Sequence, residues 1–481
     1  MSSLAGSLKA SLATAGLVLA ALVLVASWVG TAGATTAVPP VGGGAPHIAL
    51  SVAAGPPGTD LTVSGGGFGP KEHVVLSVGS AAGGVALTDG QGSFAGVGLT
   101  VPSSDQPGTV TITAVGRRSG LTAQASFDVR TNWPQQGFGP AHDGLNPYED
   151  TLDTGNVAAM ASDWSFATGA LVESSPTVAN GTVYVGSDDD HVYALDATTG
   201  AERWSFATGS SVTSAPAVWH QLVYVGSYDD TLYALSATTG AEAWTFTTGS
   251  PITSSPSVVD GIVYVSSTDD RIYALNATTG SQIWSFTTGA SVSSSPAVVH
   301  GILYVGSYDD RLYALNASTG VELWTFTAGS YVTSSPAVAD GTVYVGSFDH
   351  SVYALNATTG LLRWTFATGA VVGAEPAVGK GIVYVGSYDD TLYALNAQSG
   401  ARVWSFTTGG SIAASAAVAN GVVYVSSDDG TFDAFDAATG ARLWTDAAST
   451  STDNLSSPAV ADGTLYVGSG DGTVYAFHLP G

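Results

Sequence analysis

The 481-residue chain contains no cysteine, and only 12 of its residues are lysine or arginine. The absence of cysteine excludes disulfide bonds, zinc–thiolate sites, cysteine nucleophiles and an acylated-cysteine lipid anchor. The 38 acidic residues outnumber the basic ones and give a net charge of −26, which argues against binding to nucleic acid or to anionic membranes. Charged residues are scarce at 10%, but hydrophobic residues reach 45%, so the chain can still bury a large core.

The N-terminus carries a single early cation, Lys9, and then an apolar run from about residue 13 to residue 29. The run ends in Ala32-Gly33-Ala34, which is typical of a secretory cleavage site. We therefore expect a signal peptide at residues 1–34, a linker at 35–46 and no membrane span after cleavage. An uncleaved anchor is the alternative, because residues 10–30 carry no charge. Both interpretations predict that the rest of the chain is secreted or lies in the cell envelope.

Residues 47–130 alternate apolar and polar positions between turns rich in Gly, Pro and Asp. This pattern predicts about seven strands, and their spacing favours a β-sandwich. The segments GPPGTDLTVSGGGFGP and DGQGSFAGVGLTVP resemble bacterial cell-surface Ig-like modules, which implies a spacer or adhesive role. Residues 131–160 show no clean period, and we call them the lead-in segment.

From residue 161 to residue 481 the chain repeats itself, with a tryptophan at a constant step of 40 residues. The tyrosine of a YV(G/S)S motif follows each tryptophan, and the last unit carries a two-residue insertion near Asp453. A repeat of this length with only strand signals indicates a propeller blade. The recurrent tryptophans are Trp164, Trp204, Trp244, Trp284, Trp324, Trp364, Trp404 and Trp444.

Each unit divides into four predicted strands. Two-residue turns such as Asn180-Gly181 and Asp260-Gly261 suit a type I′ hairpin between the first two strands. The chain enters the repeat at a lone Trp strand, residues 163–167, and ends after a third strand, residues 473–477. The first Trp strand can therefore complete the last blade and close a ring of eight blades without exposed sheet edges.

The unit YVGSYDDRLYALNASTGVELWTF resembles the repeat of quinoprotein-type propellers, the PQQ-like repeat, with its ALxxxTGxxxW docking motif. The resemblance implies that the eight tryptophans pack between successive blades, near residues such as Ala314 and Gly320. It also implies similarity to the propeller subunit of the outer-membrane barrel assembly machinery. The predicted fold class is thus all-β: an eight-bladed propeller of PQQ-like repeats preceded by an Ig-like sandwich.

An aspartate recurs in every unit, for example Asp309, and the residue after it is Asp, His or Gly. These three residue types share a tolerance of left-handed backbone, so the pattern indicates a turn and not a metal site. The recurrent aromatic side chains are expected to pack in the hydrophobic core. Less regular positions predict a binding surface, namely Glu375, Lys380, Tyr228, Tyr308, Phe348 and Tyr388.

The resemblance to quinoproteins offers an enzyme hypothesis: a PQQ-dependent dehydrogenase with a calcium-bound quinone in the central channel. The predicted innermost strands carry mainly Ser, Ala and Pro, with Glu173 and Glu375 as acidic exceptions, so the acid and base groups for alcohol oxidation are not visible. We therefore expect an exported, non-catalytic binding or assembly scaffold without metal or cofactor, whose partner is a protein or a cell-wall glycan. The alternatives are the quinoprotein oxidoreductase and a carbohydrate-binding propeller.

Overall fold

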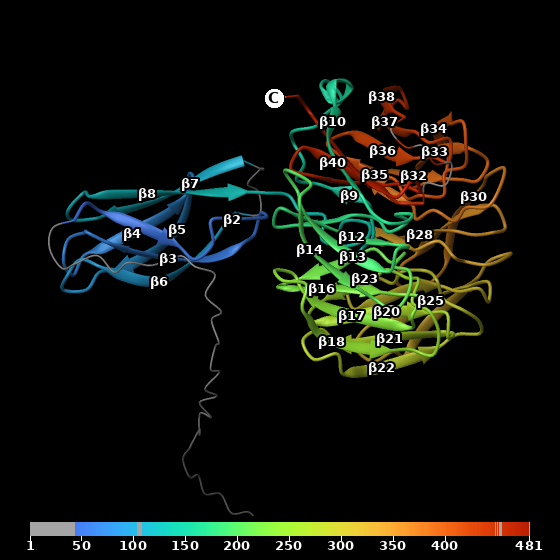
Figure 1. Ribbon diagram of the computed structural model, residues 1–481, viewed down its shortest axis with the longest axis horizontal. Helices are drawn as coiled ribbons and strands as arrows, with labels where there is room; N and C mark the ends of the chain where they lie inside the picture. The colour runs from blue at the N-terminus through green and yellow to red at the C-terminus, as the bar shows by residue number, and fades with distance from the viewer. Residues whose placement is uncertain (1–43, 103–107, 448, 450, 452–454, 481) are drawn as a thin grey trace, which may run out of the picture. The chain divides into compact units, whose positions relative to one another are not determined.

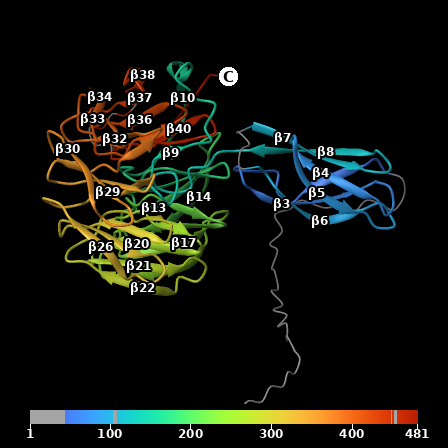
Figure 2. The ribbon, with the colours of Figure 1, turned by 180° about the vertical axis from the view of Figure 1, so that it is seen from behind.

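The computed structural model describes residues 44–102, 108–447, 449, 451 and 455–480. Nearly all regular structure in these residues is β-strand, and the short 3₁₀ helix η1 (Val157–Ala159) is the exception (Figures 1 and 2). No helix within these residues is long and apolar enough to cross a membrane. The expected signal peptide, residues 1–34, lies outside the described residues.

Residues 47–129 form two sheets, one with strand order β1-β3-β6 and one with order β2-β8-β7-β4-β5. Side chains from both sheets, among them Val63 and Phe127, are fully buried in a single hydrophobic cluster. The strands are β1 (His47–Leu50), β2 (Ala54–Gly55), β3 (Asp60–Gly66), β4 (His73–Val78), β5 (Ala81–Leu87), β6 (Phe94–Thr100), β7 (Gly108–Gly116) and β8 (Thr122–Val129).

From residue 161 onward, each unit of the sequence repeat forms a sheet of four antiparallel strands, the arrangement typical of propeller blades (Figure 1). We number these repeat sheets 1 to 8 in chain order. Sheet 1 contains β11 (Thr177–Ala179), β12 (Thr182–Ser187), β13 (His191–Asp196) and β14 (Glu202–Ala207); sheet 2 contains β15 (Ala217–Trp219), β16 (Leu222–Gly226), β17 (Thr231–Ser236) and β18 (Glu242–Thr247); sheet 3 contains β19 (Ser257–Val259), β20 (Ile262–Ser267), β21 (Arg271–Asn276) and β22 (Gln282–Thr287); sheet 4 contains β23 (Ala297–Val299), β24 (Ile302–Gly306), β25 (Arg311–Asn316) and β26 (Glu322–Thr327).

The second half of the repeat continues the pattern. Sheet 5 contains β27 (Ala337–Ala339), β28 (Thr342–Gly346), β29 (Ser351–Asn356) and β30 (Leu362–Ala367); sheet 6 contains β31 (Ala377–Gly379), β32 (Ile382–Gly386), β33 (Thr391–Asn396) and β34 (Arg402–Thr407); sheet 7 contains β35 (Ala417–Ala419), β36 (Val422–Ser426), β37 (Phe432–Asp436) and β38 (Arg442–Asp446); sheet 8 contains β39 (Ala459–Ala461), β40 (Thr464–Gly468), β41 (Thr473–His478) and β10 (Ala161–Ala167). The short strand β9 (Leu145–Asn146) of the lead-in segment joins sheet 7 beside β35.

Sheet 8 unites the two ends of the repeat. Strand β10 pairs antiparallel with β41, and Trp164 lies opposite Ala476. This pairing confirms the expectation that the first Trp strand completes the last sheet. The inner strands of successive sheets contact one another from β11 to β39, and β39 in turn contacts β11.

The turns divide each repeat sheet into two opposite ends, which we call the hairpin face and the Asp-turn face. At the hairpin face both residues of the first hairpin have positive φ, as in Asn420 (44°) and Gly421 (83°), except in sheet 2, where His220 (54°) has positive φ and Gln221 does not. At the Asp-turn face the residue after the recurrent aspartate is left-handed, with φ of 69° at Asp310, 68° at His350 and 85° at Gly430. These angles confirm that the Asp, His and Gly at this position meet a backbone requirement.

Each recurrent tryptophan of sheets 1 to 6 and of strand β10 reaches the following repeat sheet in the ring. The indole nitrogen of Trp324 in sheet 4 donates to the carbonyl oxygen of Ala357 in sheet 5 at 3.0 Å, and the Tyr304 hydroxyl donates to the same oxygen at 3.0 Å. The indole lies so close to Gly360 that a Cβ there would be 2.6 Å from Trp324 Cε3. The glycine of the Thr-Gly turn is therefore required both for its φ of 69° and for this close approach.

Candidate functional site

Apart from Glu375, the residues just before the inner strands are small or proline, and hydrogen bonds between neighbouring sheets occupy most of their hydroxyl groups. Ser294 Oγ accepts from Gly306 N at 3.0 Å and donates to the Ser334 carbonyl of the next sheet at 3.2 Å. Ser295 Oγ accepts from Ser255 N of the preceding sheet at 2.9 Å. This serine lattice therefore binds sheet to sheet around the ring of inner strands.

The lead-in segment contacts the inner strand of every repeat sheet in turn. Trp133 and Val178 form an isolated bridge in which each backbone amide donates to the other residue's carbonyl, at 2.7 and 2.8 Å. The remaining sheets follow in order: Val218 N donates to Pro134 O, Val258 N to Gln135 Oε1, Val298 N to Pro140 O, Val338 N to Ala141 O, Val378 N to Asp143 O and Val418 N to Gly144 O, and Val460 O accepts from Asn146 Nδ2.

This path follows the inner edges at the hairpin face. Asn132 Oδ1 accepts from Asn180 N of a hairpin turn at 3.1 Å, and Glu149 Oε2 accepts from Gly463 N of another at 3.1 Å. Inner-edge amides that would otherwise be unpaired are thereby satisfied. This role was missed from the sequence because the segment has no periodic pattern of apolar residues. The available signal was its succession of turn residues, and in the structure the backbone reaches one inner strand after another.

Glu375 lies beneath the lead-in segment and is 4% exposed. Its Oε2 atom is 3.6 Å from Nδ1 of the fully buried His142, and it accepts from Gln136 Nε2 at 3.4 Å. The expectation that Glu375 belongs to an exposed binding surface is therefore wrong, because the lead-in segment covers it. Burial raises the pKa of the neighbouring Asp143 to about 6, and the negative charge of Glu375 adds to the increase.

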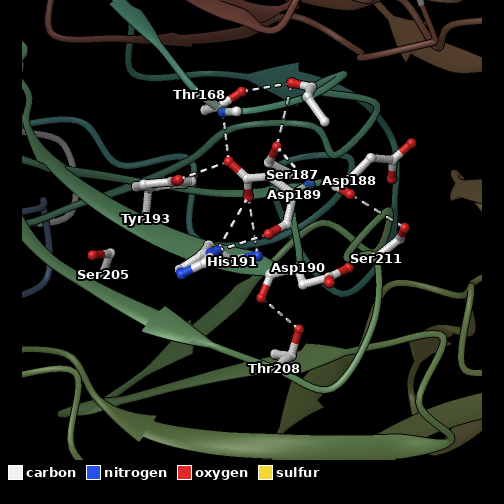
Figure 3. A network of polar contacts seen from close by, with 12 residues as sticks. Thr168, Ser187, Asp188, Asp189, Asp190, His191, Tyr193, Ser205, Thr208 and Ser211 are labelled. Atoms are coloured by element: carbon white, nitrogen blue, oxygen red, sulfur yellow. Dashed lines mark hydrogen bonds and ion pairs between the residues drawn. The ribbon is translucent and has the colours of Figure 1, made fainter.

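The recurrent aspartate is held by protein donors (Figure 3). Asp189 Oδ2 accepts from Gly169 N at 2.6 Å and from the Tyr193 hydroxyl at 2.7 Å, while Oδ1 accepts from His191 N at 3.1 Å. Burial, followed by the bond to Asp189, raises the pKa of Tyr193. The two bonds to Oδ2 recur in sheets 1 to 6, so the aspartate fastens each of these sheets to the loop that precedes it, whereas Oδ1 of Asp269, Asp309 and Asp349 has no hydrogen-bond partner among the described residues. Among the described residues, no group of three or more His, Cys, Asp or Glu side chains could hold a metal ion.

The aromatic residues expected to form a binding surface lie at the Asp-turn face, opposite the lead-in segment. Tyr228, Tyr308 and Tyr388 are 44%, 37% and 43% exposed, and Phe348 is half-buried. Lys380, although exposed, occupies a hairpin turn with φ of 49° and therefore lies at the other face. The six predicted residues thus divide among the two faces and the buried position of Glu375.

Tyr331 belongs with these aromatic residues and was missed from the sequence. It is 45% exposed, and its ring centroid lies 5.2 Å from that of Tyr308 and 6.0 Å from that of Phe348. The available signal was a departure from the repeat, because the equivalent positions one unit earlier and later hold Ser291 and Val371.

A cleft of about 570 Å³ opens beside this aromatic surface. Tyr228 and Tyr308 line it together with Pro251, Thr253, Thr268, Ala290, Ser291 and Ser293. Its position coincides with sheet 3, where Thr268 stands at the place that holds Tyr228 and Tyr308 in the neighbouring sheets. A small side chain between two large ones therefore creates the cleft.

A family model described as "Outer membrane protein assembly factor BamB" matches residues 153–268, 200–296, 268–371 and 349–480. No curated protein sequence matches the chain. Among solved structures, BamB from Moraxella catarrhalis is 19% identical with a TM-score of 0.58, and the match covers 66% of this chain and 99% of that one.

Enzymes share the same fold. Quinohemoprotein alcohol dehydrogenase from Comamonas testosteroni is 20% identical with a TM-score of 0.64, covering 73% of this chain and 81% of that one. A europium-containing methanol dehydrogenase is 17% identical with a TM-score of 0.62, covering 72% of this chain and 98% of that one. At such identities these likenesses concern the fold, and they support a PQQ-like propeller.

Proposed function

The chain belongs to the PQQ-like repeat family described as outer membrane protein assembly factor BamB, and we propose that it is a non-catalytic binding or assembly scaffold. The observation that carries this proposal is the lead-in segment, which contacts all the inner strands at the hairpin face. The segment leaves the Asp-turn face, with its exposed aromatic residues, as the end where a partner can reach the ring of inner strands.

The alternative is a quinoprotein oxidoreductase, and the described residues do not fit a calcium-bound quinone. Glu375, an acidic residue beside the inner strands, faces His142 and Gln136 of the lead-in segment. The serines at the neighbouring positions already bind backbone groups of adjacent sheets. An oxidoreductase would need a convergent set of ligands and a base at this place. This disagreement favours the scaffold over the enzyme.

We further propose that the eight repeat sheets are the blades of one closed propeller and that the recurrent tryptophans dock neighbouring blades. The contact of β39 with β11 and the pairing of β10 with β41 support the closed ring. We propose that the two sheets at residues 47–129 are an Ig-like spacer, and that an N-terminal signal peptide exports the protein to the envelope or the outside of the cell. A protein partner fits this location, and a cell-wall glycan is the second candidate.

The enzyme and scaffold hypotheses differ in their response to the quinone. Purified full-length protein is titrated with PQQ and Ca²⁺ while its absorbance is recorded, and dye-coupled oxidation of alcohols and sugars is measured in parallel. We expect no saturable absorbance change and no activity. Cofactor-dependent oxidation that disappears in Glu375→Gln would overturn the proposal.

The scaffold itself is tested by cross-linking the tagged, full-length protein in intact cells of its native host and identifying what co-purifies. We expect a defined envelope partner whose binding to the purified protein is saturable. A protein that is cross-linked to no partner, or whose apparent partners fail to bind after purification, would contradict the proposal.

A further inference from the structure

The cleft at the Asp-turn face lies where two positions that hold aromatic residues in neighbouring units hold small ones. Thr268 replaces the aromatic residue found at Tyr228, Tyr308 and Tyr388, and Ser291 stands at the position of Tyr331 in the next unit. Both small residues line the cleft, and the rings of Tyr228 and Tyr308 form its walls. The cleft therefore lacks two bulky side chains that other units carry, although Ser291 itself matches Ser211 and Ser411.

The lining combines aromatic walls with hydroxyl groups. Thr268 Oγ1 donates to Pro251 O at 3.0 Å, and Ser291 Oγ donates to Thr268 O at 3.2 Å, so these two residues are fixed in place. The two wall tyrosines are 44% and 37% exposed, which leaves part of each ring accessible from solvent.

The electrostatic surroundings of the cleft are negative. Burial raises the pKa of Tyr228, and the negative charges of Glu173 and Asp188 add to the increase. Each unit also places acidic residues at the Asp turn, such as Asp230 and Asp270 in the two sheets that contribute Tyr228 and Thr268 to the cleft. The cations nearest to these turns in the sequence, Arg271 and Arg311, begin third strands and interact with Tyr273 and Tyr313.

We infer that this cleft binds a basic peptide segment of a partner protein, with an arginine or lysine side chain between Tyr228 and Tyr308. Aromatic faces attract a cation through their quadrupoles, and the surrounding carboxylates add a long-range attraction. A neutral glycan would use the same rings but would gain nothing from the negative field. The inference deepens the proposed scaffold function, on which it rests, by naming the site and the chemistry of the partner.

The test uses two peptides and full-length protein. The probe is a fluorescein-labelled Gly-Ser-Arg-Gly-Arg-Ser-Gly peptide, and the comparison peptide carries citrulline at both arginine positions. We expect the arginine peptide to bind with an affinity that falls as salt is added, and the citrulline peptide to bind at least about tenfold more weakly, which corresponds to about 1.4 kcal/mol.

Two variants fill the cleft without changing the net charge. Thr268→Tyr introduces the residue found at Tyr228, Tyr308 and Tyr388, and Ser291→Tyr introduces the residue found at Tyr331, so both are expected to fold. Phe348→Tyr is the matched control, because it makes a change at the position equivalent to Thr268 but outside the cleft. We expect each cleft-filling variant to lower the affinity for the arginine peptide at least about tenfold and the control variant to leave this affinity unchanged.

Wild-type affinity in both cleft-filling variants would overturn the inference, because binding would then reflect the overall charge of the protein. Equal affinity for the citrulline peptide would also overturn it, in favour of recognition of a neutral ligand. A cross-linked envelope partner that is retained by Thr268→Tyr would leave the scaffold function standing while this site fails. Failure of the wild-type protein to cross-link to any partner would instead contradict the scaffold function itself.

Discussion

The contact between tryptophan and glycine at each sheet boundary makes a quantitative prediction for Gly360→Ala. Gly360 and Gly341 belong to the same repeat sheet and have the same φ, 69°. A Cβ on Gly341 would meet nothing within 4 Å, whereas a Cβ on Gly360 would lie 2.6 Å from Trp324 Cε3. The two Gly→Ala variants therefore share the backbone cost and differ in the collision with the indole.

The shared cost of a left-handed alanine is about 1–2 kcal/mol. Gly360→Ala must in addition displace the indole, which costs about 1–3 kcal/mol as overpacking. That displacement also stretches the 3.0 Å bond from Trp324 Nε1 to Ala357 O. We expect Gly360→Ala to lower the free energy of unfolding by about 1–3 kcal/mol more than Gly341→Ala.

Urea unfolding of the full-length variants, followed by far-UV circular dichroism, measures this difference. Trp324→Ala supplies a second arm: it should cost about 3–5 kcal/mol alone, and in its presence Gly360→Ala should retain only the backbone cost. Equal stabilities of Gly360→Ala and Gly341→Ala would show that the indole does not pack closely against Gly360. Additive effects of Gly360→Ala and Trp324→Ala would show the same.

Three further predictions concern the turns and the lead-in segment. Asp229→Ala removes the acceptor of Gly209 N and of the Tyr233 hydroxyl, so it should destabilise the fold by about 1–3 kcal/mol. Asp230→Gly should change the stability by less than about 1 kcal/mol, because Gly430 occupies the equivalent left-handed position in sheet 7. Equal thermal midpoints for the two variants would contradict this prediction. The pKa of Asp143 is raised from 3.8 to about 6, so the folded state binds this proton more tightly, and the associated stability is present below pH 3.8 and lost as pH rises to about 6. Asp143→Asn should therefore gain up to about 3 kcal/mol over the wild type between pH 4 and pH 7, and a pH-independent difference in urea midpoints would refute the shift. Hydrogen exchange should show protected amides at Val218, Val298 and Val338, which donate to the lead-in segment, and rapid exchange there would show that the segment does not hold these strands.

The repeat sheets were predicted well from the sequence because the eight units contain the same local constraints. Asn276, for example, caps its turn by accepting from Thr278 N and Thr279 N, and Gly280 supplies the left-handed residue that follows. Such constraints act between residues a few positions apart, so they can be read from one unit and checked in the others.

The candidate site was predicted less well, for a physical reason. Whether Glu375 is exposed depends on His142, which lies far away in the sequence, in a segment without periodicity. The effect of Thr268 depends on the rings of Tyr228 and Tyr308 in the two adjacent sheets. Neither arrangement follows from propensity or pattern, because both are set by which chain segment passes over which sheet.

The repeat also limits where a partner-specific surface can develop. Trp324 and Asp349 form hydrogen bonds across a sheet boundary, and Gly360 packs against the Trp324 indole across one. A change at any equivalent position therefore disturbs two sheets at once. The hairpin face is constrained in addition by the lead-in segment, which binds one inner strand after another. Thr268 and Tyr331 are constrained less, because Tyr331 is 45% exposed and the Thr268 side chain lines the cleft with one bond, to Pro251 O of the preceding loop. Substitution at these positions changes the shape of the Asp-turn face with less effect on the sheet boundaries, which supports our proposal that departures from the repeat at this face contribute to partner recognition.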